Sequence, residues 1–304
     1  MSNAFLFPGQ GSQYVGMGED IYNQSDSAKL LYHTASDILG FNLQDVSFRG
    51  PEDRLMETQF TQPAILVHSI IVDKFLKDKD IKPDAVAGHS LGEFTALVSA
   101  NVLSFKDALK IVKVRSTEMA NTGKQSPGTM AAILGADDKQ LKIICKQDGI
   151  VVPANLNAPG QIVISGEINA IENAIITAKN IGIRRALPLN VSGAFHSPLM
   201  SPARKALSKM INTLRFKDAY IPVFQNVSAA PVTKASIIQE NILKQLENPV
   251  LWSDTILNMK KYGITDFIEV GPGNVLNGLN RRIYPESTTI NCDKLEHLEA
   301  YEVL

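Results

Sequence analysis

The chain alternates short, mainly apolar runs with longer stretches whose apolar residues recur every three or four positions. Runs of the first kind, such as 4–7, 84–87 and 264–270, predict buried strands. Stretches of the second kind predict amphipathic helices. We expect helices at 26–39, 44–48, 61–77, 91–101, 104–121, 201–214, 237–246, 253–261 and 275–283, and further strands at 221–226 and 289–292. Strands that alternate with helices in this way are typical of an α/β fold with a parallel sheet.

The pattern changes between residues 124 and 193. After a break at 123–128, which contains Gly and Pro, strands are expected at 129–134, 149–157, 161–165 and 183–191, and helices at 137–146 and 169–180. The order β-α-β-β-α-β within about 70 residues is the split unit of a ferredoxin-like fold. We therefore predict a ferredoxin-like subdomain at 124–193, inserted into a catalytic subdomain made of residues 1–123 and 194–304.

Two local features give narrower expectations. Gln62 and Pro63 open the helix predicted at 61–77, and a proline is well tolerated in the first turn of a helix. The last dozen residues are rich in Glu and Lys, and we expect them to form a weakly ordered tail.

Five residues, Gly88-His89-Ser90-Leu91-Gly92, stand between a predicted strand and a predicted helix. The pattern Gly-x-Ser-x-Gly in this setting indicates a nucleophile elbow. The two glycines permit a turn too tight for a Cβ atom, and this turn holds the serine in a strained, exposed position. The backbone N–H groups at the start of the helix face any oxyanion formed there. An ordinary turn that carries a serine is the alternative, and we favour the nucleophile.

A second glycine-rich loop, at 9–18, follows the first strand. It lacks the glycine spacing of a dinucleotide-binding loop and the Gly-Lys-Ser/Thr ending of a phosphate loop. Open α/β sheets place ligands at the carboxyl ends of their strands. We therefore expect this loop to lie beside the ligand site, with a flexible connection as the alternative.

A serine hydroxyl needs a base that takes its proton, and histidine is the usual base near neutral pH. His89 adjoins the serine in a tight turn, so its side chain should point elsewhere. His33 and His68 lie within helical patterns, and His297 lies in the charged tail. His196 remains, in a Gly/Ser/Pro loop after a predicted strand, and we expect it to be the base.

No acidic residue stands out as the third member of a triad. In α/β-hydrolases the acid falls between the serine and the histidine in sequence. The acids that we consider there lie in the predicted insertion: Asp137, Asp138, Asp148, Glu167 and Glu172. A carbonyl oxygen can also orient a histidine, because the proton on its second nitrogen needs only an acceptor. We therefore favour a Ser–His dyad.

The composition is that of a globular protein, with 44% hydrophobic and 20% charged residues among 304. The net charge of −1 gives no electrostatic reason to expect nucleic acid or an anionic membrane as a partner. The N-terminal segment has no basic stretch followed by a long apolar core, so we expect no signal peptide. The two cysteines show no metal-binding spacing. Because we expect no export signal, we expect a cytoplasmic protein with reduced cysteines.

Eight motifs, in the right order over nearly the whole chain, resemble the malonyl-CoA:acyl carrier protein transacylases. That family includes the discrete enzyme of fatty-acid synthesis and free-standing acyltransferases that serve polyketide synthases. The motifs are Phe7-Pro8-Gly9-Gln10-Gly11-Ser12-Gln13, Thr61-Gln62-Pro63-Ala64, Gly88-His89-Ser90-Leu91-Gly92-Glu93, Arg115, Asn155-Leu156-Asn157-Ala158-Pro159-Gly160-Gln161, Gly193-Ala194-Phe195-His196, Asn248-Pro249-Val250 and Glu269-Val270-Gly271-Pro272-Gly273. The resemblance implies an α/β-hydrolase-like large subdomain with an inserted ferredoxin-like small one.

The resemblance also implies a role for each matching residue. Ser90 would take the acyl group as an ester, and His196 would be the general base and then the acid that protonates the CoA thiolate. The backbone N–H groups of Gln10 and Leu91 would form the oxyanion hole. Arg115 would hold the free carboxylate of malonate, a task that its planar fork suits better than lysine. Without the resemblance, a helical arginine is more often a surface residue.

Further residues have implied roles around this site. Gln62 and Met119 would line the substrate pocket, and the carbonyl oxygen of Gln245 would accept the second proton of His196. Phe195 would crowd a substituent on the acyl α-carbon, and one methyl group is usually worth only ~1–3 kcal/mol. Packing is its other interpretation. Gly193 departs slightly from several members of the family, which affects the width of the pocket.

The implied mechanism is ping-pong: malonyl-CoA acylates Ser90, CoA leaves, and the phosphopantetheine thiol of an acyl carrier protein attacks the ester. It needs no metal and no tightly bound organic cofactor. No motif points to a symmetric interface, so we expect a monomer. One alternative is an acyl hydrolase, but Arg115 favours a dicarboxylic acyl group over the apolar pocket of a general thioesterase. The other is a non-catalytic carrier-protein binding module, which the intact Ser90, His196 and Arg115 disfavour.

Overall fold

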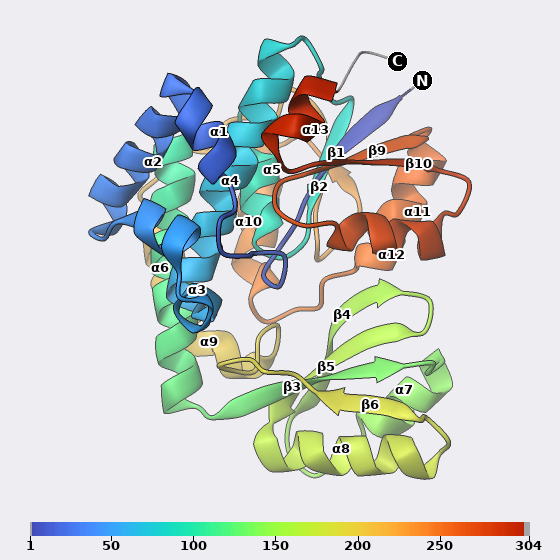
Figure 1. Ribbon diagram of the computed structural model, residues 1–304. Coiled ribbons are helices and arrows are strands. Elements are labelled where there is room, and N and C mark those ends of the chain that lie inside the picture. The colour runs from blue at the N-terminus through green and yellow to red at the C-terminus, as the bar shows by residue number, and fades with distance from the viewer. Residues whose placement is uncertain (1, 301–304) are drawn as a thin grey trace.

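Within residues 2–300, which the computed structural model describes, a six-stranded sheet forms the centre of the larger part of the molecule (Figure 1). The strands lie in the order β10-β9-β1-β2-β7-β8, and neighbouring strands are parallel except for β7 with β8. Their bounds are β1 Asn3–Phe7, β2 Ala85–Gly88, β7 Val223–Phe224, β8 Pro231–Val232, β9 Asp266–Val270 and β10 Thr288–Cys292.

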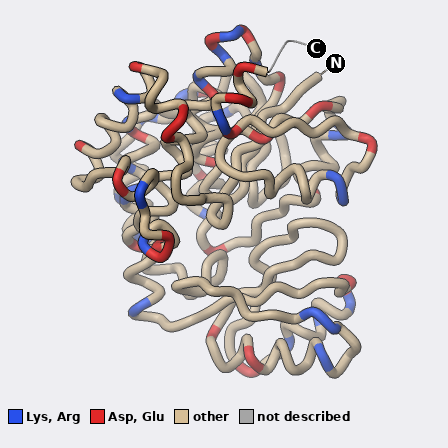
Figure 2. Tube along the Cα trace, in the orientation of Figure 1, with Lys and Arg blue, Asp and Glu red and all other residues tan. Residues whose placement is uncertain are grey.

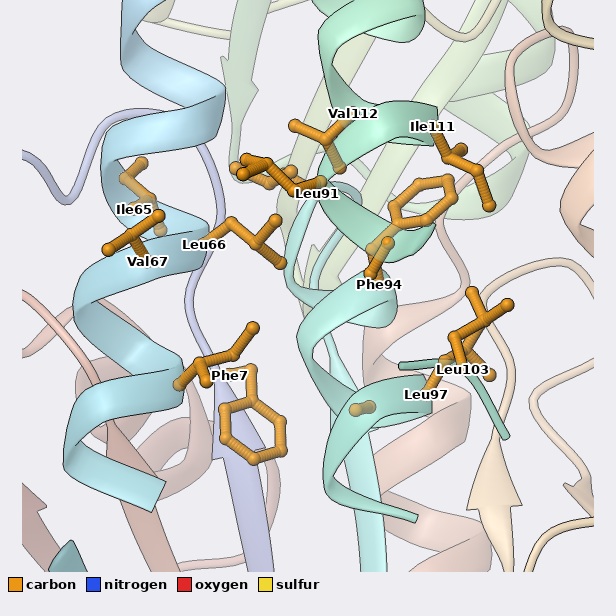
Figure 3. Packing of buried hydrophobic residues seen from close by; sticks show 14 of the residues in the cluster. Phe7, Ile65, Leu66, Val67, Leu91, Phe94, Leu97, Leu103, Ile111 and Val112 are labelled. Carbon is orange, nitrogen blue, oxygen red and sulfur yellow. The ribbon is translucent and has the colours of Figure 1, made fainter. Parts of the chain in front are cut away.

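Helices cover both faces of this sheet, because its strands are apolar on both sides. Phe5 and Phe7 of β1 belong to one buried cluster, and Ala4 and Leu6 belong to another. Figure 3 shows the first cluster, where Phe7 lies beside side chains of helices α4 (Thr58–Asp78) and α5 (Gly92–Ser99). The second cluster contains Trp252 and other residues of its helix, α11 (Trp252–Tyr262), together with residues of the next helix, α12 (Val275–Ile283). The result is a three-layered α/β/α arrangement.

Along the chain, the helices of this larger part lie between and after the strands of the six-stranded sheet. They are α1 Glu19–Gln24, α2 Asp26–Leu39, η1 Asp45–Arg49, α3 Glu52–Met56, α4 Thr58–Asp78, α5 Gly92–Ser99, α6 Phe105–Gln125, η2 Pro198–Met200, α9 Ser201–Ile211, α10 Ala235–Gln245, α11 Trp252–Tyr262, α12 Val275–Ile283 and α13 Leu295–Ala300.

A second, smaller sheet lies below the first in Figure 1 and is antiparallel throughout. Its strands lie in the order β4-β5-β3-β6, and α7 and α8 connect them. The elements are β3 Gly128–Leu134, α7 Asp138–Ile144, β4 Val151–Ala158, β5 Gln161–Glu167, α8 Ile168–Asn180 and β6 Arg185–Pro188. This is the predicted β-α-β-β-α-β order, and the fold class is confirmed. The exact limits of the two subdomains stay a prediction.

The chain passes between the two parts of the molecule twice, and the two connecting segments lie in close contact. A Cβ atom on Gly123 would lie 2.0 Å from the backbone oxygen of Ser192, and one on Gly193 would lie 3.1 Å from the Cα atom of Gly123. The chain therefore leaves and re-enters the larger part through adjacent segments, and Gly123 has no room for a side chain where they meet.

Three local predictions are wrong. Helix α4 begins at Thr58, because the carbonyl oxygen of Glu57 accepts the N–H groups of Phe60 and Thr61, both at 2.9 Å. Pro63 therefore lies inside the helix and not in its first turn. The predicted break at 123–128 begins too early, because α6 continues to Gln125. Gly123 allows a close crossing instead of ending the helix.

The third wrong prediction is the tail. Residues 295–300 form helix α13, whose Leu298 is buried. The carbonyl oxygen of Leu298 accepts a hydrogen bond from Lys79, and the N–H of Leu295 donates to Asp20 at 2.7 Å. Contacts with α1 and α4 thus order a segment whose composition is polar. The remainder of the predicted tail, 301–304, lies outside the described residues.

The surface carries charges of both signs. In the view of Figure 2, Lys and Arg are interspersed with Asp and Glu over the outer helices and turns. No helix among residues 2–300 is both long and apolar enough to cross a membrane. The same residues contain no group of three or more His, Cys, Asp or Glu side chains placed to hold a metal ion.

Replacing Gly123 by alanine should destabilise the protein, because the new Cβ atom would meet the Ser192 oxygen and one chain must move. Overpacking of this kind costs about 1–3 kcal/mol of unfolding free energy. Gly278→Ala is the matched control: Gly278 is also helical, but nothing lies within 4 Å of its added Cβ atom. The control should gain about 0.5–1 kcal/mol. Urea unfolding measures both, and a Gly123→Ala protein as stable as the wild type would contradict the close crossing.

Candidate active site

The Gly-x-Ser-x-Gly segment forms a tight turn between β2 and α5. Ser90 has a φ angle of 51°, in the left-handed region that residues other than glycine rarely adopt. A Cβ atom on Gly88 would lie 1.9 Å from the carbonyl carbon of Gly92, and one on Gly92 would lie 2.0 Å from the oxygen of Phe7. Only glycine fits at either position. The side chain of Asn226 supports the turn by accepting the Ser90 N–H at 2.8 Å.

His196 lies against this serine, as predicted. The Oγ atom of Ser90 is 2.9 Å from Nε2 of His196. The other ring nitrogen, Nδ1, is 2.9 Å from the carbonyl oxygen of Gln245 and 3.2 Å from that of Asn248. Carbonyl oxygens only accept, so Nδ1 carries the proton and Nε2 is free to accept the serine proton. A carbonyl pair therefore occupies the place of the acid in a triad.

The environment of His196 keeps its ring neutral. The side chain is buried, and burial lowers its pKa to about 3, with a further contribution from the positive charge of Arg115. A histidine with an ordinary pKa of about 6.5 would be partly protonated near neutral pH. His196 is thus in the form that can take a proton from Ser90.

Two backbone N–H groups near Ser90 are available to a ligand. Within residues 2–300, the N–H groups of Gln10 and Leu91 have no acceptor. Gln10 lies in the glycine-rich loop after β1, which packs tightly on the elbow: a Cβ atom on Gly9 would lie 2.4 Å from the His89 oxygen. Gln10 and Leu91 line the same cavity as Ser90. The arrangement can serve as an oxyanion hole.

Arg115 of α6 is fully buried beside the serine, which is the opposite of the surface position that its sequence context alone favours. Its guanidinium donates to Gln62 Oε1 at 2.7 Å, Gln245 Oε1 at 3.0 Å and Ser90 Oγ at 3.1 Å. An arginine has five N–H donors, so one Nη1 donor and the buried Nε–H have no partner among the described residues. Burial lowers the pKa of Arg115 to about 9, which leaves it charged at neutral pH. Within the described part of the chain, no carboxylate lies within ion-pair distance of it.

These residues surround one cavity of about 290 Å³ between the two parts of the molecule. Eight of the predicted site residues line it: Gln10, Gln62, Ser90, Leu91, Arg115, Met119, Phe195 and His196. The ninth, Gln245, lies behind His196 and Arg115, and it contacts both of them. Met119 also orients Gln62, because the Gln62 Nε2 atom donates to the Met119 sulfur at 3.4 Å.

Sequence reasoning missed two polar residues of this region. His89 bonds to Asn157 of β4 at 2.8 Å and lies 5.4 Å from the Trp252 ring, so it joins the elbow to the smaller sheet. Burial lowers the pKa of His89, which keeps this contact neutral. Glu93 is a buried carboxylate in the first turn of α5, and burial raises its pKa to about 7. Its sequence signal was available: it is the sole charge in an otherwise apolar or small-residue helix at 92–99.

The lowered pKa of His196 predicts how the reactivity of Ser90 depends on pH. A base works only above its pKa, so labelling of Ser90 by a fluorophosphonate probe should persist from about pH 8 down to about pH 5. Replacing Arg115 by methionine removes a nearby positive charge, which should raise the pKa of His196 and move the loss of labelling to higher pH. Initial labelling rates, followed by intact-protein mass, measure both effects. A wild-type rate that falls by half near pH 6.5 would contradict the neutral, buried base.

Comparisons with known proteins agree on one family. The sequence model of the acyl transferase domain family matches residues 4–291. The malonyl CoA-acyl carrier protein transacylase of Bacillus subtilis is 44% identical over 97% of this chain and 95% of its own length. The solved malonyl-CoA:ACP transacylase of Synechocystis sp. has a TM-score of 0.93 at 40% identity, and the match covers 99% of this chain and 100% of that one.

A further solved relative is a malonyl-transacylase in complex with its acyl carrier protein from a type II polyketide synthase. Its TM-score is 0.94 at 37% identity, over 98% of each chain. Matches of this length and identity extend over both parts of the molecule and the cavity between them. The chain belongs to the acyl transferase domain family, among the malonyl-CoA:acyl carrier protein transacylases.

Proposed function

We propose that this protein transfers a malonyl group from malonyl-CoA to the phosphopantetheine thiol of an acyl carrier protein, through an ester on Ser90. The observation that carries the proposal is the buried Arg115, which adjoins Ser90 and keeps N–H donors without a partner among the described residues. A buried positive charge without a carboxylate partner calls for an anionic ligand. The relatives are named for malonyl transfer to an acyl carrier protein, which supports the same assignment.

In the first half-reaction, His196 takes the proton of the Ser90 hydroxyl while Oγ attacks the thioester carbonyl carbon of malonyl-CoA. The carbonyl oxygen becomes an oxyanion, which the N–H groups of Gln10 and Leu91 stabilise. Loss of one such donor typically costs ~3–4 kcal/mol of transition-state stabilisation. The C–S bond then breaks, and His196 gives its proton to the CoA thiolate. The products are malonyl-Ser90 and free CoA.

The second half-reaction reverses these steps with a different thiol. His196 takes the proton of the phosphopantetheine thiol, and the sulfur attacks the ester carbonyl carbon of malonyl-Ser90. The same two N–H groups stabilise the oxyanion. The C–O bond breaks, Ser90 regains its proton from His196, and the malonyl group leaves as a thioester of the carrier protein.

Acyl selection comes from side chains that line the cavity beside Ser90 and His196. Arg115 binds the free carboxylate of the malonyl group, and Gln62, which itself donates to the Met119 sulfur, holds the arginine in place. Phe195 is buried in the wall next to His196, where its ring limits the room for a substituent on the acyl α-carbon. We therefore expect a discrimination of ~1–3 kcal/mol against an acyl group that carries a methyl branch on its α-carbon.

The proposed setting follows from the same chemistry. The reaction needs no metal or bound cofactor, since the nucleophile, base and oxyanion donors are all groups of this chain. We place the protein in the cytoplasm, as a monomer whose partners are malonyl-CoA and a carrier protein, with no role for nucleic acid or a membrane. The same transfer supplies malonyl groups to either fatty-acid or polyketide synthesis. Hydrolysis of the malonyl ester by water is the competing activity.

Mass spectrometry of the intact protein tests the proposal. Mixing with malonyl-CoA should add one malonyl group to Ser90, and adding a phosphopantetheinylated carrier protein should move that group to the carrier. The carrier without phosphopantetheine is the matched control and should leave the adduct in place. Ser90→Ala should remove all loading. Rapid release of free malonate, at the same rate with either form of the carrier, would instead identify a hydrolase.

A further inference from the structure

A buried carboxylate that the proposed reaction does not use lies directly behind the active site. Glu93 is 1% exposed, in the first turn of α5. Its Oε1 atom accepts hydrogen bonds from the Gln225 side chain at 3.2 Å and the Asn226 N–H at 3.4 Å, and its Oε2 atom accepts from Gln245 Nε2 at 2.5 Å. All three partners are donors, so the ionised carboxylate is the form that satisfies them.

The Gln245 side chain is held with a defined orientation between Glu93 and Arg115. Its Nε2 atom donates to Glu93 and to the Ser90 carbonyl oxygen at 2.9 Å. Its Oε1 atom is thereby turned to Arg115, from which it accepts at 3.0 Å. A flipped amide would put its NH₂ group against the guanidinium and its oxygen against the carboxylate, and both contacts are repulsive. Glu93 therefore helps to determine which end of the amide faces the arginine.

The order of these side chains also keeps two buried charges apart. Glu93 reaches Arg115 only through the neutral Gln245 amide, and the other two side-chain partners of the guanidinium, the Gln62 amide and the Ser90 hydroxyl, are also neutral. If the carboxylate and the amide exchanged places, the carboxylate would contact Arg115 directly. A buried ion pair would then form, and the arginine would already be neutralised when the acyl group arrived.

We propose that Glu93 is a positioning residue for acyl-group selection: it fixes the Gln245 amide so that a neutral oxygen faces Arg115 and the arginine keeps its charge for the acyl carboxylate. This inference rests on the proposed function, because it assigns Arg115 to a carboxylate. The essential feature is which position carries the acid. Glu93 on α5 is the acid, and Gln245 at the end of α10 is the amide.

Exchanging the two side chains tests that order. The double variant Glu93→Gln/Gln245→Glu keeps the composition, the net charge and a hydrogen bond between the two positions, but it moves the carboxylate onto Arg115. The ratio of kcat/KM for malonyl-CoA to kcat/KM for acetyl-CoA should fall by about 100-fold. Damage common to both substrates cancels in this ratio. The thermal stability of the double variant should exceed that of Glu93→Gln alone, which leaves buried donors facing an amide NH₂ group.

Glu269→Gln is the matched control. Glu269 is also fully buried, also accepts two N–H groups, from Leu276 and Asn277, and lies on β9 outside the cavity. This control should lower thermal stability but keep the wild-type ratio. A double variant that keeps the wild-type ratio, or one that is no more stable than Glu93→Gln, would overturn the assignment. A wild-type protein with no preference for malonyl-CoA would refute the proposed function itself, and the role of Glu93 would fail with it.

Discussion

The positive charge of Arg115, buried beside Ser90 and held by neutral amides, is the interaction on which the site depends. Removing a guanidinium from water is costly unless its donors are satisfied, and three of them bond to Gln62, Gln245 and Ser90 within the chain. The charge itself has no carboxylate partner within reach among the described residues. The charge of Arg115 also lowers the pKa of His196, so one residue both offers a positive charge to an anionic ligand and helps to keep the base neutral. Acyl recognition and nucleophile activation are thus coupled through a single side chain.

The fold brings these groups together from distant parts of the chain. Sterically obligatory glycines place Ser90 at the end of β2, and the oxyanion loop follows the neighbouring strand β1. Arg115 and Gln62 come from long helices on one face of the sheet, and His196 follows the return from the smaller sheet. The segment that leads to Phe195 and His196 packs tightly against α6 at Gly123, which helps to hold these two side chains in place.

Local sequence was sufficient where local sterics decide the structure. The elbow, the strands 4–7 and 84–87 and the β-α-β-β-α-β order could be predicted, because glycine placement and apolar periodicity determine them. The burial of Arg115 could not be predicted from local sequence. Its partners lie 53 and 130 positions away, and only the resemblance to a family indicated its role. Glu93 was missed for the same reason, since its donors come from α10 and from the segment after β7. Helix α13 was missed because six residues carry too short a pattern, and its contacts with Asp20 and Lys79 are long-range.

Recognition of the free acyl carboxylate by Arg115 can be measured by comparing malonyl-CoA with acetyl-CoA as acyl donors. The comparison uses the wild type, Arg115→Lys and Arg115→Ala, with the acylated Ser90 measured by mass. Arg115→Ala should shift the preference from malonyl-CoA towards acetyl-CoA by about 100-fold or more, and Arg115→Lys, which keeps the charge but not the planar fork, should lie between the wild type and Arg115→Ala. Unchanged malonyl loading in Arg115→Ala would show that Arg115 does not bind the carboxylate.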